Sequence, residues 1–244
     1  MDGGDGYDSW RDSCSLETSD APHWGPSARV GGEELQPGED ERIEGLARAI
    51  AARPPRMVEV EGEVPSAAVA LLVRPVEDDL ELLLIRRAER EGDPWSGHMA
   101  LPGGRAAPGD EDDAATAARE TLEEVGIDVR AAGRFLGPLD VLTPMSDRAP
   151  RITVAPFVFA VPAGAEAEPN EEVSLAIWVT LTELSEPGAA AEYLHEMGDG
   201  TVMAFPAYGA RGHLVWGLTH RILSGFLELY STVDDAEQLR DGMA

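Results

Sequence analysis

Two apolar segments joined by a short turn constrain the fold of this chain more than any other feature. Residues 66–75 read SAAVALLVRP, residues 80–87 read LELLLIRR, and residues 76–79 between them have the composition of a turn. Apolar runs bounded by turn residues are typical of β-strands, and two in close succession predict a hairpin. The core of the molecule is therefore expected to contain a β-sheet.

Helical patterns alternate with further strand patterns along the chain. Apolar residues recur at three- and four-residue steps in 41–53, and an Ala-rich helix is predicted at 113–125, where Gly126 suits the C-terminal cap. Strands interspersed with helices predict an α/β fold in which helices cover a sheet. The remaining predicted elements are strands at 98–101, 135–142, 152–161, 175–179 and 202–205, and helices at 182–184 and 213–230.

The two ends of the chain differ from its middle. Residues 1–40 hold ten acidic residues and two arginines and show no periodicity. They are predicted to be a disordered acidic tail, because they bury too little apolar surface to offset the entropy lost on ordering. Docking of this tail on a partner or on the surface of the domain is the alternative. One domain is expected at 41–232, followed by an acidic C-terminal tail at 233–244.

The charge of the chain narrows its expected partners. Nineteen basic residues, all of them Arg, and 46 acidic residues give a net charge of −27. Nucleic acid and anionic membranes are excluded as expected partners, because both bind basic surfaces. No apolar run approaches the roughly 20 residues of a membrane helix, no secretory signal is visible, and Cys14 is the only cysteine. A cytoplasmic protein without disulfides is expected.

Three carboxylates mark the predicted helix 113–125 as the chemical centre. Glu120, Glu123 and Glu124 stand at positions i, i+3 and i+4 and therefore share one helix face. Like charges repel at this spacing, and carboxylate oxygens are the ligands that hard divalent cations such as Mg²⁺ prefer. The adjacent Arg119 can pair with a carboxylate, and the glycine turn at 103–104 can bring a carbonyl to the metal. The alternative is a solvated acidic helix face.

The segment 101–127, LPGGRAAPGDEDDAATAARETLEEVGI, resembles the signature of the Nudix hydrolases, G-x5-E-x7-R-E-U-x-E-E-x-G-U with U aliphatic. Its second half matches, except that Thr121 occupies an aliphatic position. Asp110 follows Gly104 after five residues in place of Glu, and eight residues rather than seven separate it from Arg119. This spacing resembles the coenzyme A pyrophosphatase branch of the family.

Three other segments resemble the same branch, which carries an Arg after a strand and then Gly-x3-Phe-Pro-Gly-Gly. Residues 83–87, LLIRR, and 97–104, GHMALPGG, correspond to these features, with Leu101 in place of Phe. Residues 215–219, VWGLT, also resemble that branch. The resemblance extends from about residue 66 to residue 230.

The resemblance implies an α/β/α sandwich with a mixed central sheet and an enzyme that needs Mg²⁺ or Mn²⁺. By this resemblance Glu120 and Glu124 bind the metal directly, and Glu123 binds the metal or a metal-bound water. The carbonyl of Gly103 adds a ligand, and Arg119 orients the glutamates. Glu172 lies where related enzymes place a general base, although an acidic loop without a catalytic role is the alternative.

Four arginines are candidates for binding the phosphates of the substrate, since Arg suits bidentate phosphate contacts and basic residues are scarce here. They are Arg86, Arg87, Arg90 and Arg105, and Gly104 is assigned to substrate binding with them. Pairing of these arginines with the surplus acids is the alternative. His98 is expected to be structural, and Trp178 and Trp216 are expected to lie in the core.

The function implied is hydrolysis of the pyrophosphate bond of coenzyme A or its thioesters. The products are 3′,5′-ADP and 4′-phosphopantetheine or its acyl form. One alternative is a Nudix hydrolase of ADP-ribose or another nucleoside diphosphate derivative. Another is a non-catalytic, nucleotide-binding Nudix-like module. The expected partner is a small nucleotide substrate, and a homodimer is compatible with the resemblance.

Overall fold

The structure is a computed structural model that describes residues 40–241 apart from 63, 94, 146–150 and 197–199, with the side chains of 234–241 also outside the description. The tail predicted at 1–40, apart from Asp40, lies outside the described residues. No described helix is both long enough and apolar enough to cross a membrane.

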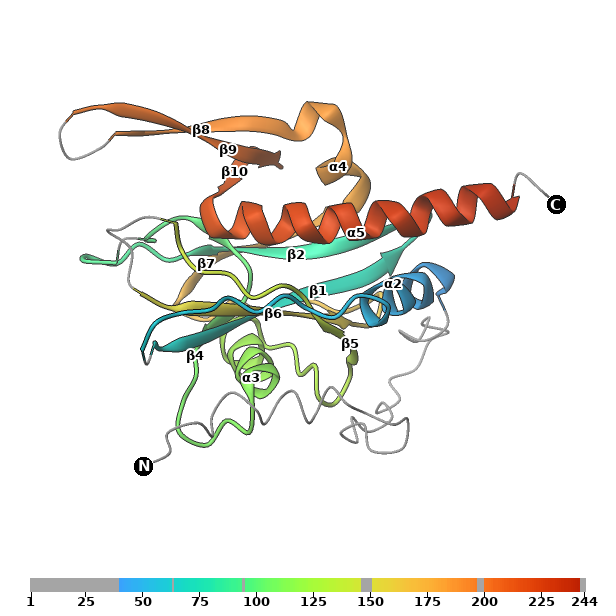
Figure 1. Ribbon diagram of the computed structural model, residues 1–244, viewed down its shortest axis with the longest axis horizontal. Helices are drawn as coiled ribbons and strands as arrows, with labels where there is room; N and C mark the ends of the chain where they lie inside the picture. Colours follow the sequence, from blue (N-terminus) through green and yellow to red (C-terminus); the bar gives the residue numbers. More distant parts are fainter. Residues whose placement is uncertain (1–39, 63, 94, 146–150, 197–199, 242–244) are drawn as a thin grey trace.

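Within the described residues a seven-stranded mixed sheet forms the centre of the molecule (Figure 1). The strand order is β3-β2-β1-β6-β5, with β4 also paired to β1 and β7 also paired to β2. β1 runs parallel to β6, and the other pairs are antiparallel. The strands are β1 (Ser66–Val76), β2 (Asp79–Arg87), β3 (Met99–Ala100), β4 (Gly103–Arg105), β5 (Arg134–Pro138), β6 (Thr153–Ala160) and β7 (Val173–Thr180).

The predicted hairpin is confirmed, because β1 and β2 pair directly and Val76 lies opposite Asp79. The two residues between them make the turn, and Glu77 adopts a φ of 32° there. Strand β5 is shorter than predicted. It ends at Pro138, after a bulge near Gly137, whose φ is 139°.

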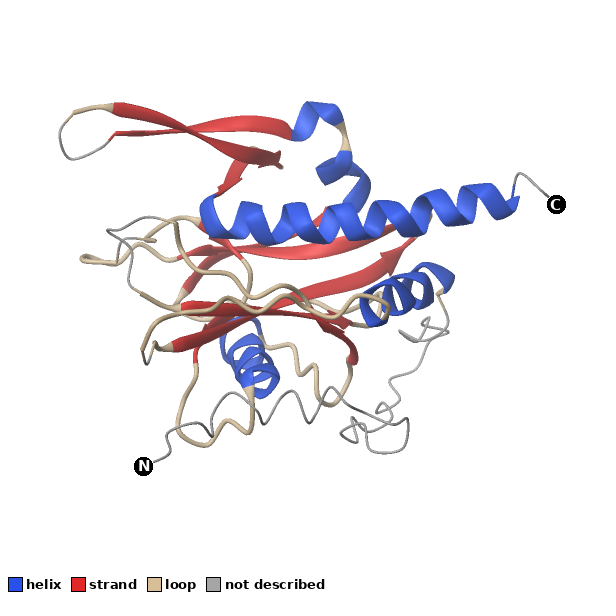
Figure 2. Ribbon diagram, viewed as in Figure 1, coloured by secondary structure: helices blue, strands red, loops and turns tan. Residues whose placement is uncertain are grey.

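Helices cover both faces of this sheet (Figure 2). Helix α3 (Asp113–Val125) packs on one face, where alternate β1 residues such as Ala70 and Leu72 meet it. Helices α2 (Glu41–Ala51) and α5 (Gly217–Asp241) cover the other face, where Leu71 and Val73 lie. Burial on both faces explains why the strand sequence is almost continuously apolar rather than alternating. The predicted α/β/α sandwich with a mixed sheet is confirmed.

A second sheet was not predicted as such. Strands β8 (Ala190–Glu196), β9 (Val202–Ala210) and β10 (His213–Trp216) form an antiparallel sheet in the order β10-β9-β8. In Figure 1 it lies above the central sheet, on the side of α5. The short helix α4 (Leu181–Ser185) and a 3₁₀ turn at Pro187–Ala189 lead into it.

The prediction of one helix over 213–230 is wrong at its start. Residues 213–216 pair with β9, and α5 begins directly after them at Gly217, whose φ is 66°. The helix then continues to Asp241 and so includes residues 233–241, which the sequence assigned to a C-terminal tail. Apolar residues at helical spacing across 213–216 could not distinguish a strand from a helix, because the segment is only four residues long.

Candidate metal centre

Helix α3 is capped at both ends. The side chain of Asp112 accepts a hydrogen bond from the backbone N–H of Ala115 at 2.6 Å and caps the N-terminus. Gly126 closes the C-terminus in the left-handed conformation, with a φ of 71°. The glutamates predicted to share a helix face therefore lie in the last two turns of α3, next to strand β4.

The glycine turn before α3 packs closely against its neighbours. A Cβ on Gly103 would collide with the backbone of β1, and a Cβ on Gly104 would collide with the carboxylate of Glu120. The backbone N–H of Gly103 donates to a carboxylate oxygen of Glu124 at 2.9 Å. The turn is thus a cradle in which the carboxylates of Glu120 and Glu124 rest against backbone.

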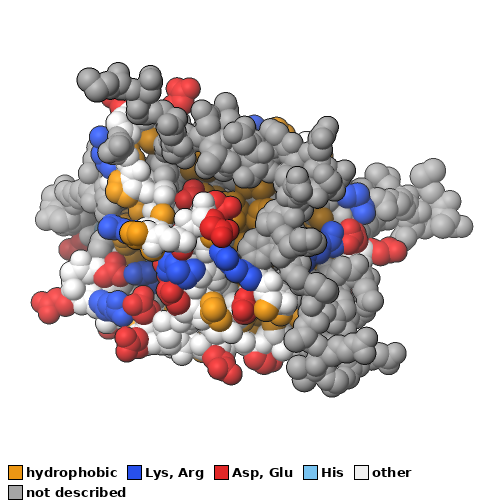
Figure 3. All heavy atoms as spheres, turned by 90° about the horizontal axis from the view of Figure 1, so that it is seen from below, with side chains coloured by type: hydrophobic (Ala, Val, Ile, Leu, Met, Phe, Trp, Pro, Cys, Tyr) orange, Lys and Arg blue, Asp and Glu red, His pale blue; other side chains and the backbone are white. Residues whose placement is uncertain are grey.

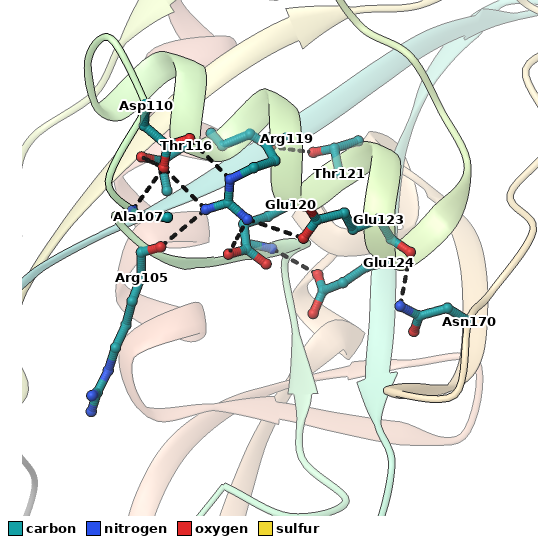
Figure 4. Close-up of polar contacts among 12 residues, drawn as sticks. Arg105, Ala107, Asp110, Thr116, Arg119, Glu120, Thr121, Glu123, Glu124 and Asn170 are labelled. Atoms are coloured by element: carbon teal, nitrogen blue, oxygen red, sulfur yellow. Dashed lines mark hydrogen bonds and ion pairs between the residues drawn. The ribbon is translucent and has the colours of Figure 1, made fainter.

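Arg119 connects the acidic side chains around this cradle (Figure 4). Its guanidinium donates to both carboxylate oxygens of Asp110 at 2.9 and 3.0 Å and to the backbone carbonyl of Arg105 at 3.1 Å. It also contacts Glu120 at 2.9 Å and Glu123 at 3.0 Å. The hydrogen bonds from Arg119 hold the pKa of Asp110 well below its usual range, and those to Asp110 raise the pKa of Arg119.

The site concentrates negative charge away from water. Burial raises the pKa of Glu124 to about 7, and the negative charges of Glu120 and Glu172 add to the effect. Burial also raises the pKa of Glu120, where the hydrogen bond from Arg119 acts in the opposite direction. Two neighbouring carboxylates that both resist ionisation form a site that a cation would stabilise.

The residues present fit a divalent metal by their chemistry, because carboxylate oxygens beside a backbone cradle are the ligands that Mg²⁺ and Mn²⁺ prefer. Within the part of the chain that the structure describes, however, no three acidic or histidine side chains are already grouped closely enough to hold an ion. Arg119 holds Glu120 and Glu123, and the backbone of Gly103 holds Glu124. A bound cation would therefore replace these contacts.

A loop before β7 is attached to the end of α3 by hydrogen bonds from two residues. The backbone N–H of Glu168 donates to the carbonyl of Val125 at 2.8 Å, and Asn170 makes the other contacts. Asn170 donates from its side chain to the carbonyl of Glu123 at 2.8 Å and from its backbone to the carbonyl of Glu124 at 2.9 Å. Its side-chain oxygen accepts from the backbone N–H of Glu172 at 2.7 Å. Asn170 thereby places the predicted base, Glu172, where its charge acts on Glu120 and Glu124. Asn170 was not predicted from the sequence, where it stands out only as a polar residue in an acidic loop.

Two of the four candidate arginines lie close to this centre. Arg87 pairs with Asp93 at 2.8 Å, and its positive charge acts on Glu124. The Nε–H of Arg87 is buried and, among the described residues, has no hydrogen-bond partner. Arg90 pairs with Glu172 at 3.2 Å. Arg87 and Arg90 thus pair with acids, as the alternative expected. Their binding of substrate phosphates stays a prediction.

The other two arginines are directed elsewhere. Arg86 donates to the carbonyl of Gly97 at 3.1 Å and lies 3.7 Å from Glu89, in the loop after β2. Arg105 contributes its carbonyl to the contacts of Arg119, but its side chain points away from the glutamates (Figure 4). On the face that carries α3, arginine side chains are interspersed among acidic ones (Figure 3).

Comparisons with known proteins identify the family of the chain. The family model of the NUDIX domain matches residues 64–197. A protein of Mus musculus, the mitochondrial coenzyme A diphosphatase NUDT8, is 32% identical over 172 residues, which cover 68% of this chain and 78% of that protein. An uncharacterised protein of Schizosaccharomyces pombe is 44% identical over 117 residues, which cover 46% of this chain and 36% of that protein.

Other relatives carry broader names. The chloroplastic Nudix hydrolase 22 of Arabidopsis thaliana is 29% identical over 164 residues, which cover 65% of this chain and 52% of that protein. The chain spans about a third to a half of the length of the first curated relatives that it matches. A solved MutT/nudix family protein from Enterococcus faecalis shares the fold with a TM-score of 0.50 at 18% identity, over 73% of this chain and 65% of that chain.

Proposed function

Since the chain belongs to the Nudix family, we propose that it is a metal-dependent pyrophosphohydrolase whose substrates are coenzyme A or its thioesters. The observation that carries the hydrolytic part is the arrangement of Glu120 and Glu124 against the glycine cradle, beside Arg119. A buried acidic pair of this kind has little structural value by itself, because like charges without a cation destabilise the folded chain.

The reaction requires neutralisation of charge, because the diphosphate repels a nucleophile. When bound, Mg²⁺ or Mn²⁺ neutralises phosphate oxygens and lowers the pKa of water. Glu120 and Glu124 hold the cation in this proposal, Glu123 supports it from the exposed side, and Arg119 orients the carboxylates. Glu172 accepts the proton of the attacking water. Addition of that water across the pyrophosphate bond of coenzyme A gives 3′,5′-ADP and 4′-phosphopantetheine.

Two arginines supply positive charge for the substrate in this proposal. The positive charge of Arg87 acts on Glu124, and its guanidinium pairs with Asp93. In this proposal Arg87 attracts a phosphate group that approaches the metal centre. Arg90 is held by Glu172, so a phosphate that takes Arg90 also releases the proposed base. Binding and activation of the base are thereby linked.

The choice of coenzyme A rests on the sequence segments around the glycine turn and on the name of the mouse relative. A hydrolase of ADP-ribose or another nucleoside diphosphate derivative is the second candidate, because the plant relatives carry only general Nudix names that specify no substrate. The non-catalytic alternative is disfavoured, because the three glutamates and Arg119 are all present and in contact with the cradle or with one another.

A hydrolysis screen tests the proposal. The purified chain is incubated with Mg²⁺ or Mn²⁺ and with coenzyme A, acetyl-coenzyme A, ADP-ribose or a dinucleoside polyphosphate, and Glu120→Gln is the inactive control. We expect 3′,5′-ADP from the coenzyme A substrates. Faster turnover of ADP-ribose would overturn the substrate assignment. Tight nucleotide binding without any turnover would overturn the assignment as an enzyme.

A further inference from the structure

Four aromatic side chains of the second sheet and His98, which precedes β3 of the central sheet, gather into one group. Tyr193 and Trp216 stack with ring centroids 4.0 Å apart and an interplanar angle of 17°. His98, Phe205 and His195 surround Trp216 at 4.9, 5.6 and 5.8 Å. We call these five residues the aromatic cluster.

The register of the second sheet places its four members of the cluster on one face. Tyr193 of β8 lies opposite Phe205 of β9, and Trp216 of β10 lies opposite Ala207, two residues further along the same strand. Residues two apart on a strand point to the same side. All five rings are partly exposed, so the expectation that Trp216 lies in the core is wrong. Rings that stack with each other but remain open to solvent offer an apolar platform.

Arg87 connects the cluster to the metal centre. Its backbone N–H donates to the carbonyl of His98 at 3.0 Å. Burial is the main cause that raises the pKa of Glu124 and lowers that of His98, and the charge of Arg87 acts on both groups. His98 also precedes Gly103 by five residues, which span at most about 17 Å. One extended ligand can therefore contact both the cluster and the metal centre.

We propose that the aromatic cluster binds the nucleobase of the substrate, by stacking on the Tyr193–Trp216 pair, while the diphosphate lies at the metal centre. The inference rests on the proposed function only in taking a nucleoside diphosphate derivative as the ligand. A base stacked on an aromatic side chain contributes about 1–3 kcal/mol. The imidazoles of His98 and His195 supply donors and acceptors for the edge of a base.

The charge of the chain favours a base as the occupant. At a net charge of −27 the protein repels the phosphates of its substrate at long range. A neutral aromatic ring experiences no such repulsion, so stacking adds affinity that the phosphates alone do not provide. An acyl chain is the competing occupant, because the exposed side chains of Met203 and Leu214 lie on the same face of the sheet.

Calorimetric titration with ADP and with inorganic pyrophosphate, in Mg²⁺, tests this inference without turnover. Tyr193→Leu removes the ring but keeps an apolar side chain, so ADP affinity should fall about 5- to 150-fold while pyrophosphate affinity stays constant. Tyr193→Phe should restore ADP binding. Leu194→Ala, an exposed residue on the opposite face of β8, should change neither, and circular dichroism should show the same fold throughout.

Three outcomes would overturn the inference. Unchanged ADP affinity in Tyr193→Leu would exclude stacking, and an equal loss for ADP and pyrophosphate would indicate a general distortion. If Tyr193→Leu lost affinity only for a long-chain acyl-coenzyme A and not for coenzyme A, the platform would be assigned to the acyl group. Ring-dependent ADP binding by a chain that hydrolyses no diphosphate would support the cluster and refute the proposed function, so the two can fail separately.

Discussion

At the scale of single residues, Gly104 gives the sharpest test of the cradle. In Gly104→Ala the new Cβ meets the carboxylate of Glu120, which must move away from the position shared with Glu124. We expect kcat to fall about 100-fold, since displacements near 1 Å at a reacting centre have effects of this size. Steady-state kinetics with coenzyme A and Mg²⁺ measures it.

Gly188→Ala is the matched control, because a Cβ there meets nothing within 4 Å and the residue has no positive φ. Its kinetics should equal those of the wild type. Full activity in Gly104→Ala would show that the position of Glu120 against the turn is unimportant.

Glu124 should give the metal-free protein a characteristic pH dependence. Its pKa, raised from 4.5 to about 7 mainly by burial, means that the folded chain binds this proton more tightly than the unfolded chain does. The associated stability is complete below about pH 4.5 and is lost as the pH rises through 7, up to a limit of about 3 kcal/mol.

Glu124→Gln removes this titration but keeps an acceptor for the N–H of Gly103. In the presence of a metal chelator, the variant should therefore become more stable relative to the wild type as the pH rises from about 4.5 to about 8. The quantity compared is the free energy of unfolding of the variant minus that of the wild type. Urea denaturation at several pH values measures the difference. A difference that stays constant with pH would contradict the raised pKa.

At the scale of elements, the sequence predicts best where structure depends on neighbours in the chain. Helix α3 begins and ends as predicted because Asp112 and Gly126 are local caps, and the β1–β2 hairpin follows from two adjacent apolar runs. Strand β10 was missed because it has only four residues, and strand β8 because it is amphipathic and largely exposed. Both gain their pairing from β9.

The same distinction applies to the candidate site. Glu120, Glu123 and Glu124 could be found because a helix repeat brings them together. Asn170 could not, since its contact with Glu123 joins positions 47 residues apart, and no periodicity reports such a contact. The aromatic cluster was missed for the same reason, because Trp216 meets Tyr193 through the pairing of the second sheet and His98 across to the central sheet.

Asn170 links two elements, and its replacement should affect catalysis through Glu172. Asn170→Ala removes two side-chain hydrogen bonds, which lowers stability by about 1–3 kcal/mol. We expect kcat to fall about tenfold with little change in KM, because the proposed base loses its support. The pH dependence of kcat should broaden or shift, which a purely structural loss would not produce.

Glu171→Ala is the control for this substitution, as it alters the neighbouring exposed residue and leaves both hydrogen bonds of the Asn170 side chain intact. It should retain the kcat of the wild type. Equal activity of the two variants would show that Asn170 does not position Glu172 for catalysis.

At the scale of the whole molecule, the charge of −27 sets how an anionic substrate approaches. Raising the ionic strength from about 10 to about 150 mM shortens the screening length from about 30 to about 8 Å. At saturating Mg²⁺, kcat/KM for coenzyme A should therefore rise with added NaCl, while kcat stays constant. A fall in kcat/KM would show that local attraction by arginines such as Arg87 outweighs the repulsion of the whole chain.

The proposed mechanism depends on a divalent cation at the acidic face of α3. Crystals soaked in Mn²⁺ test for this cation most directly. We predict an anomalous difference peak bonded to the carboxylates of Glu120 and Glu124, with Glu120 released from Arg119. Soaked crystals of Glu124→Gln should show a weaker peak or none. Wild-type crystals with no peak at this position, and with Glu120 still hydrogen-bonded to Arg119, would contradict the metal-dependent mechanism.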